Sequence, residues 1–186
     1  MKIATANEVY DFWFNENNEE NWFKRSDTFD EEMRDRFYDT WDAARQGLLY
    51  EWRNTFEGAL AEIIVLDQFS RNLNRRTMLS YTQDNMALIL SQNLMQQYPD
   101  YKERSEDEIT FIYLPWMHSE SKEIQKETEE LYLELDNEEL TKYMYQHKEI
   151  IDRFGRYPYR NEILGRTSTA DELDFISDND LDFAKN

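Results

Sequence analysis

Two stretches of the chain concentrate arginine, and clustered guanidinium groups can bind anions. Between residues 68 and 82 there are three arginines and no acidic residue, and between residues 147 and 170 five cationic side chains accompany three acids. Together these stretches carry a formal charge of +5, so the rest of a chain with net charge −19 carries −24. Converging guanidinium groups hold a carboxylate or phosphate bidentately. The sequence therefore predicts one cationic site in a strongly acidic protein.

The first stretch places hydrogen-bonding side chains on one stripe of a helix. At 3.6 residues per turn, positions i, i+1, i+4, i+5 and i+8 share a face. Amides and guanidinium groups have fixed hydrogen-bonding geometry, unlike the Glu- and Lys-rich faces elsewhere in the chain. A ligand-binding or buried network and a plain i, i+4 salt bridge on a solvated face both remain open. The stripe consists of Asp67, Gln68, Arg71, Asn72 and Arg75.

The second stretch leaves a helix at Gly155 and turns around Pro158. A loop of this kind can bring several guanidinium groups to one carboxylate or phosphate. Alternatively, its first arginines neutralise the negative end of the preceding helix and the others pair with surface acids. The ligand-binding candidates in this stretch are Arg153, Arg156, Arg160, Asn161 and Arg166.

Two histidines and one carboxylate are candidates for catalysis. His118 precedes a predicted helix, Glu120 follows two residues later, and His147 lies on the apolar stripe of a helix. Imidazole titrates near neutrality and can transfer protons, although an inward histidine is more often a hydrogen-bonded core residue. No metal-binding spacing accompanies these residues, and the chain has no cysteine. We therefore expect no metal and no cofactor.

The overall composition narrows the possible partners and the compartment. A net charge of −19 repels phosphate backbones and anionic lipids, so we expect neither nucleic acid nor a membrane as a partner. The absence of cysteine gives no sign of an oxidising compartment. The first residues lack a signal-peptide pattern, and no apolar run is long enough to span a bilayer. We expect a cytoplasmic protein.

The elements that must position these residues are predicted to be helices. Gly and Pro are scarce, and capping boxes at Thr5/Glu8, Thr28/Glu31 and Thr169/Glu172 mark helix starts. We expect further helices at residues 56–74, 83–97, 119–135 and 137–154, with only a short apolar turn at 111–114 before Pro115. This is an all-α fold, an antiparallel helical array. It forms one domain over residues 1–177, followed by an acidic tail at 178–186.

Three motifs in this order resemble the bacterial family known as domain of unknown function 924. They are LDQFSRN (Leu66–Asn72), LPWMHSE (Leu114–Glu120) with Gln125 after it, and RFGRYPYRNEILGRTST (Arg153–Thr169). DFWF (Asp11–Phe14) and NWF (Asn21–Phe23) fit as well.

The resemblance implies a tetratricopeptide-like α-α superhelix, although the repeat signature is not visible in this chain. It implies no activity, substrate or cofactor. Tyr157 stands where the family often has phenylalanine, and Tyr159 stands where histidine is frequent. If that histidine has a chemical role elsewhere in the family, this chain lacks it.

The leading hypothesis is binding of a small anion or a carboxylate-bearing peptide in a groove. Gln68, Arg71, Asn72 and Arg75 would face the 153–166 loop, with both histidines on its floor. One alternative is a hydrolase or transferase that uses a histidine as general base, oriented by Glu120 or Asp67. Another is a protein-interaction scaffold with a purely structural polar network. The sequence favours binding over catalysis.

Overall fold

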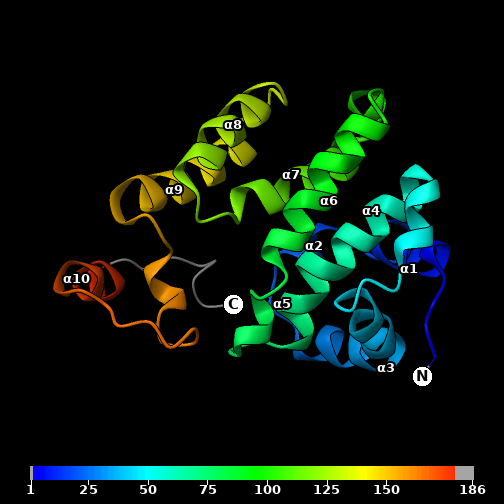
Figure 1. The fold of residues 1–186 in the computed structure, drawn as a ribbon, viewed down its shortest axis with the longest axis horizontal. Coiled ribbons are helices and arrows are strands. Elements are labelled where there is room, and N and C mark those ends of the chain that lie inside the picture. The colour runs from blue at the N-terminus through cyan, green and yellow to red at the C-terminus, as the bar shows by residue number, and fades with distance from the viewer. Residues whose placement is uncertain (1, 179–186) are drawn as a thin grey trace.

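A computed structural model describes residues 2–178, and every regular element in that range is helical (Figure 1). This confirms the predicted all-α fold. Helical hydrogen bonding suits a chain with few Gly and Pro residues. The α-helices are α1 (Ala6–Phe14), α2 (Glu19–Trp22), α3 (Asp27–Ala44), α4 (Phe56–Ile64), α5 (Ser70–Leu73), α6 (Asp84–Gln97), α7 (Glu106–Met117), α8 (Lys122–Leu133), α9 (Glu138–Phe154) and α10 (Ala170–Asp178).

Short helical turns occupy several of the connections. A π-helix, η2 (Val65–Phe69), links α4 to α5. The 3-10 turns are η1 (Tyr50–Asn54), η3 (Met78–Ser80), η4 (Tyr101–Glu103) and η5 (Pro158–Arg160).

Side chains that cap the first backbone N–H groups set several helix starts. Capping boxes form at Thr5/Glu8 and Thr169/Glu172, as predicted. The predicted box at Thr28 is wrong, because α3 starts earlier and Ser26 accepts the hydrogen bond from the Phe29 N–H. Ser26 reaches the third residue of the helix and so supplies the cap that Thr28 was expected to provide.

The predicted short turn at 111–114 is also wrong, because those residues lie inside the twelve-residue helix α7. A capping box between Ser105 and Glu108 starts α7 within a segment that had been predicted to be a charged loop. Pro115 lies inside the helix near its end, where its missing N–H removes only one hydrogen bond. Gly155 ends α9 with φ +70°, as predicted.

Aromatic side chains from distant segments make up much of the main core. Phe12, Trp13, Phe37 and Phe69 are almost fully buried and their rings lie within 4.8–6.3 Å of one another in neighbouring pairs. A smaller apolar cluster contains Ile150 and Ile151 of α9 and Tyr157 of the segment that follows α9.

The contacts between helices define how the helices are arranged in space. In Figure 1, α8 and α9 lie side by side toward one end, α1, α3 and α4 lie toward the other end, and α6 and α7 lie between them. None of the helices in the described range has the length and apolar content needed to cross a membrane. Asp178 is the last residue of α10, and the remainder of the predicted acidic tail lies outside the described residues.

Replacement of Phe69 by alanine tests the aromatic core. Phe69 is completely buried against three other rings, so Phe69→Ala should lower the free energy of unfolding by about 3–5 kcal/mol. Urea denaturation measures this difference. Phe23→Ala is the matched control, because half of that ring is exposed, and it should cost less than about 1.5 kcal/mol. Equal losses for the two variants would contradict this account of the core.

Candidate functional site

The helix that carries the first arginine stretch widens at η2, and this places two polar side chains in the interior. A π-helical turn contains an extra residue and shifts the side chains that follow it around the axis. Asp67 and Gln68 are adjacent in sequence, yet both are buried, with 1% and 7% exposure. Side chains also satisfy carbonyl groups of the widened turn: Ser70 Oγ donates to the Leu66 carbonyl and Arg71 Nη1 to the Asp67 carbonyl.

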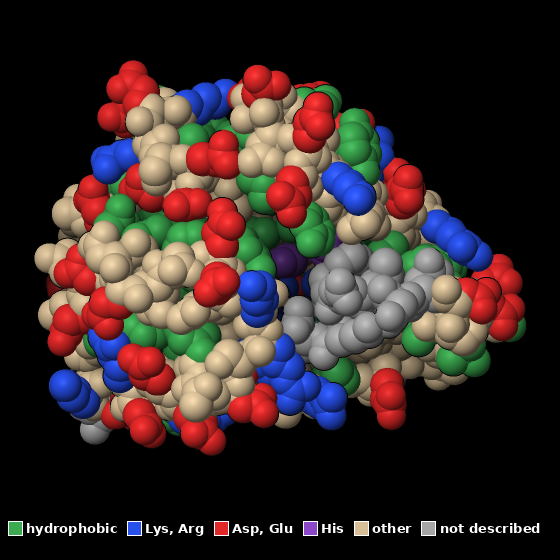
Figure 2. Space-filling view, turned by 180° about the vertical axis from the view of Figure 1, so that it is seen from behind, with side chains coloured by type: hydrophobic (Ala, Val, Ile, Leu, Met, Phe, Trp, Pro, Cys, Tyr) green, Lys and Arg blue, Asp and Glu red, His purple; other side chains and the backbone are tan. Residues whose placement is uncertain are grey.

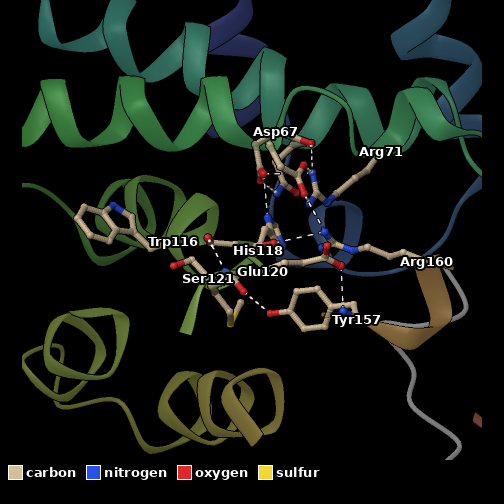
Figure 3. A network of polar contacts seen from close by, with 12 residues as sticks. Asp67, Arg71, Trp116, His118, Glu120, Ser121, Tyr157 and Arg160 are labelled. Carbon is tan, nitrogen blue, oxygen red and sulfur yellow. Dashed lines mark hydrogen bonds and ion pairs between the residues drawn. The ribbon is translucent and has the colours of Figure 1, made fainter. Parts of the chain in front are cut away.

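The Asp67 carboxylate accepts hydrogen bonds from three side chains (Figure 3). Gln68 Nε2 lies 2.6 Å from Oδ2, and Arg71 Nη1 lies 3.1 Å from Oδ1. The third partner is His118 at the end of α7, whose Nδ1 lies 2.8 Å from Oδ1. A buried carboxylate requires such compensation, since an unpaired charge in the interior is very costly.

These contacts fix the protonation of both partners. Burial alone would raise the pKa of Asp67, but Arg71, His118 and Gln68 together outweigh it and hold the pKa below its ordinary value. Burial and the nearby Arg71 guanidinium lower the pKa of His118. The imidazole is therefore neutral at pH 7, and because ionised Asp67 can only accept, Nδ1 carries the proton. The lone pair of His118 lies on Nε2.

Asp84, the first residue of α6, joins the two arginine stretches. Its Oδ1 and Oδ2 accept hydrogen bonds from Arg71 at 3.0 and 3.1 Å, and Oδ2 also accepts one from Arg160 Nη1 at 3.0 Å. Arg160 Nη1 lies 3.3 Å from the His118 carbonyl oxygen as well. Arginines 89 positions apart in sequence thus meet on one carboxylate beside the imidazole.

A second set of contacts holds the segment that carries Arg160. Glu120 accepts hydrogen bonds from both terminal nitrogens of Arg166, at 2.6 and 3.0 Å, and from the Tyr157 N–H. Burial would raise the pKa of Glu120, but these partners lower it. The Tyr157 hydroxyl donates to the Met117 carbonyl, and Gln125 donates to the carbonyls of Met117 and Ser119. Glu120 therefore positions the loop through Arg166 and the Tyr157 N–H.

His147 lies next to His118, with ring centroids 6.4 Å apart. Its Nδ1 is 2.8 Å from the Tyr143 carbonyl, which can only accept, so Nδ1 is the protonated nitrogen here too. Burial lowers the pKa of His147 to about 3. The site therefore holds two adjacent neutral imidazoles.

A histidine side chain is visible at the surface of the protein (Figure 2). Figure 2 shows a histidine side chain in a recess between hydrophobic side chains and Lys or Arg side chains. The side chain of His118 is 12% exposed, whereas that of Asp67 behind it is 2% exposed. Solvent therefore reaches part of the His118 side chain and almost none of the Asp67 carboxylate.

Several residues that were predicted to bind a ligand do not contact the cluster of Asp67, His118 and Asp84. Asn72 and Arg75 do not face the 153–166 loop, because both donate to Asp30 on α3. The i+5 and i+8 spacing assumed a regular helix, and the π-helical turn changes the register after Gln68. Arg153 stacks on Phe154 and Phe175, Arg156 pairs with Glu172, and Asn161 donates to Ser168.

Sequence reasoning did not find Asp84, which bridges Arg71 and Arg160. Acidic residues are common in the first turn of a helix, since they interact favourably with the helix dipole. The position of Asp84 in the sequence therefore did not mark it as a residue of the site. The roles of Tyr157 and Gln125 were also missed, although both residues belong to the motifs that carry the family resemblance.

Two further observations limit the choice of site. Within residues 2–178, no group of three or more His, Asp or Glu side chains is arranged to hold a metal ion. A shallow hollow of about 590 Å³ lies far from the imidazoles, between the start of the chain and α3, and is lined by Lys2, Glu8 and residues 34–39. Its charges are of both signs and lie at the surface, so the buried cluster at His118 is the stronger candidate.

Replacement of His147 by glutamine tests the burial of the neutral imidazole. Between pH 3 and 6.5 the unfolded chain binds a proton at this position that the folded protein does not, so stability falls as the pH drops through that window. From pH 6.5 to 5, His147 should account for about 1.5 kcal/mol of that loss. Urea titrations at several pH values should give a shallower decline for His147→Gln.

Above pH 7 the two stability curves should run parallel, because the imidazole is then neutral in both folded and unfolded states. Carboxylates contribute equally to both curves and cancel from the comparison. Curves that remain parallel down to pH 5 would show that His147 is not held neutral.

Comparisons with known proteins agree with this architecture. The structure of a protein of unknown function from Agrobacterium tumefaciens, ATU0120, is similar to this chain, with 33% sequence identity and a TM-score of 0.87. The alignment covers 94% of this chain and 97% of that one. A search of curated proteins gave no match. The model of a bacterial protein family of unknown function, DUF924, matches residues 9–180, and the chain belongs to this family.

Proposed function

We propose that the recess binds a small molecule and that His118 acts on it as a general base. The observation that carries this proposal is the 2.8 Å hydrogen bond between Nδ1 of His118 and buried Asp67. A carboxylate in this position holds the imidazole in one tautomer and stabilises the imidazolium that forms when Nε2 takes a proton. The reaction class that fits is hydrolysis or group transfer, in which Nε2 deprotonates water or a hydroxyl group.

The surroundings of His118 support a catalytic role. No hydrogen bond joins Nε2 of His118 to another described residue, and the side chain of His118 is 12% exposed. Burial keeps the imidazole neutral at pH 7, so the base is ready to accept a proton. A π-helical turn beside the site is also typical of functional positions in helices.

The charges of the site narrow the anion-binding hypothesis. Asp67, Asp84 and Glu120 are balanced by three guanidinium groups, those of Arg71, Arg160 and Arg166. With neutral imidazoles the cluster has no net charge. A broad cationic groove for polyanions therefore has little support, and the proposal is limited to a small molecule at the recess.

Hydrolysis of chromogenic substrates tests the proposal. Nitrophenyl esters, anilides and phosphate esters should include at least one that the purified protein hydrolyses, with kcat/KM rising through a pKa below 6.5 and level above it. His118→Gln should reduce kcat/KM by about 10²–10⁴-fold. Asp67→Asn should also reduce it strongly, because an amide can donate to Nδ1 and favour the wrong tautomer.

Arg75→Gln is the matched control, since Arg75 pairs with Asp30 away from the imidazoles, and it should leave kcat/KM unchanged. The proposal fails if His118→Gln and the wild-type protein behave alike on every substrate. Reaction with diethyl pyrocarbonate gives a second readout that needs no substrate. His118 should be acylated at Nε2, and more slowly in Asp67→Asn.

A specific observation also favours a second candidate, a purely structural network. Many of the arginines that could bind a ligand are already paired with carboxylates inside the protein. Within the described residues these pairs are Arg71 with Asp67 and Asp84, Arg75 with Asp30, Arg156 with Glu172, Arg160 with Asp84, and Arg166 with Glu120.

The stability of Arg71→Ala measures the structural contribution of the network. This substitution leaves Asp67 and Asp84 without their main cation and should cost about 3–5 kcal/mol in urea denaturation. Arg25→Ala removes an exposed pair with Asp27 and should cost less than about 1 kcal/mol. A loss as small as that of Arg25→Ala would show that the network does not stabilise the fold.

A further inference from the structure

The guanidinium group of Arg160 is buried, and one of its nitrogen donors makes no hydrogen bond to a described residue. The residue is 4% exposed, Nη1 donates to Asp84 and to the His118 carbonyl, and the guanidinium also shares a hydrogen bond with the Tyr159 side chain. Nε is buried without an acceptor within the described residues. Burial of an unsatisfied donor is costly, so native proteins rarely leave one without a function or an external partner.

The loop around Arg160 contains more than one such atom. Asn161 Oδ1 and Arg166 Nε are also buried without a partner among the described residues. Six buried side-chain atoms in residues 2–178 lack partners, and residues 160–166 supply three of them. The unmet hydrogen bonding is thus concentrated on the segment after α9 that carries Arg160.

Aromatic rings restrict the directions from which a hydrogen-bond acceptor can approach the Arg160 guanidinium. Its Cζ lies 4.4 Å from the ring centroid of Tyr157 and 4.6 Å from that of Tyr81, and the Tyr159 hydroxyl accepts a hydrogen bond from the guanidinium. Stacking occupies the faces of the guanidinium plane and leaves its edges for hydrogen bonds. A planar acceptor that approaches the edge containing Nε would meet a donor held in a fixed orientation.

The charge of the cluster limits which acceptor fits. The three carboxylates and three guanidinium groups balance, so a ligand with one negative charge adds little repulsion. A dianion would meet Asp84 and Glu120, whose charges lie close to Arg160. A carboxylate also matches the fork geometry of arginine better than a compact tetrahedral ion does.

We propose that Arg160 binds the carboxylate of the molecule on which His118 acts. The inference rests on the proposed function and defines its substrate class. Because Arg160 Nη1 donates to the backbone carbonyl of His118, the anchor and the base belong to residues that contact each other directly. The substrate is a small monocarboxylic acid with an ester, amide or other reactive group a few bonds from its carboxylate.

A titration followed by NMR tests the inference without requiring a reaction. The ¹H–¹⁵N resonance of Arg160 Nε is recorded while sodium acetate, sodium benzoate or inorganic phosphate is added at constant ionic strength and pH 7. Acetate and benzoate should shift this resonance saturably, and phosphate should bind at least about tenfold more weakly. Arg160→Lys should abolish saturable binding, since lysine keeps the charge but lacks the fork.

Arg156→Lys is the matched control, because Arg156 pairs with Glu172 outside the recess and acetate binding should persist. The titration of the wild-type protein remains decisive if Arg160→Lys does not fold. An Arg160 Nε resonance that does not move, or that responds no more than exposed Arg25, would overturn the inference. Equal binding of phosphate would overturn the assignment to carboxylates.

The two proposals fail separately. His118→Gln should retain acetate binding at Arg160 while losing turnover. Acetate binding together with full activity in His118→Gln would refute the general base and leave the carboxylate anchor standing. Absence of acetate binding together with loss of activity in His118→Gln would refute the anchor alone.

Discussion

The buried carboxylate of Asp67 is the constraint on which the site depends. An ionised carboxylate in the interior is stable only when cations and hydrogen-bond donors surround it. Gln68 and Arg71 come from the same helical segment, but His118 must come from the end of α7. The need to compensate one negative charge therefore joins segments that are 51 positions apart in sequence.

The same requirement extends outward through Asp84. Arg71 neutralises Asp67, and Asp84 compensates the cations of both Arg71 and Arg160. Arg160 in turn fixes the loop after α9, which Glu120 holds a second time through Arg166 and the Tyr157 N–H. Charge balance in this interior produces a neutral, desolvated imidazole beneath a surface that is strongly negative overall. In such surroundings a hydrogen bond to a carboxylate is stronger than it is in water.

Local features of the fold could be predicted from the sequence, and features that depend on distant packing could not. The Thr5 and Thr169 capping boxes and the Gly155 terminator depend on a few neighbouring residues, and all three are present. The capping box at Ser105 was missed because acidic residues around it are typical of a loop. The π-helical turn has no sequence pattern of its own, since packing of the surrounding core decides where the extra residue is accommodated.

The contacts of the site also divide into those that neighbouring residues predict and those that depend on distant packing. The contact between Asp67 and Arg71 follows from their spacing, and His118 and Arg160 stood out by residue type. Asn72 and Arg75 were assigned to the same face, and the register change at η2 directs them to Asp30 instead. The pairing of Arg160 with Asp84 spans 76 positions and depends on tertiary structure, so no local pattern indicates it.

The protonation state of His118 tests the central claim most directly. Long-range ¹H–¹⁵N correlation spectra distinguish the two neutral tautomers of each histidine from the charged form. At pH 7 the account predicts a neutral His118 with its proton on Nδ1, a bare Nε2, and a pKa below 6.5. A charged imidazolium at pH 7, or a proton on Nε2, would contradict it.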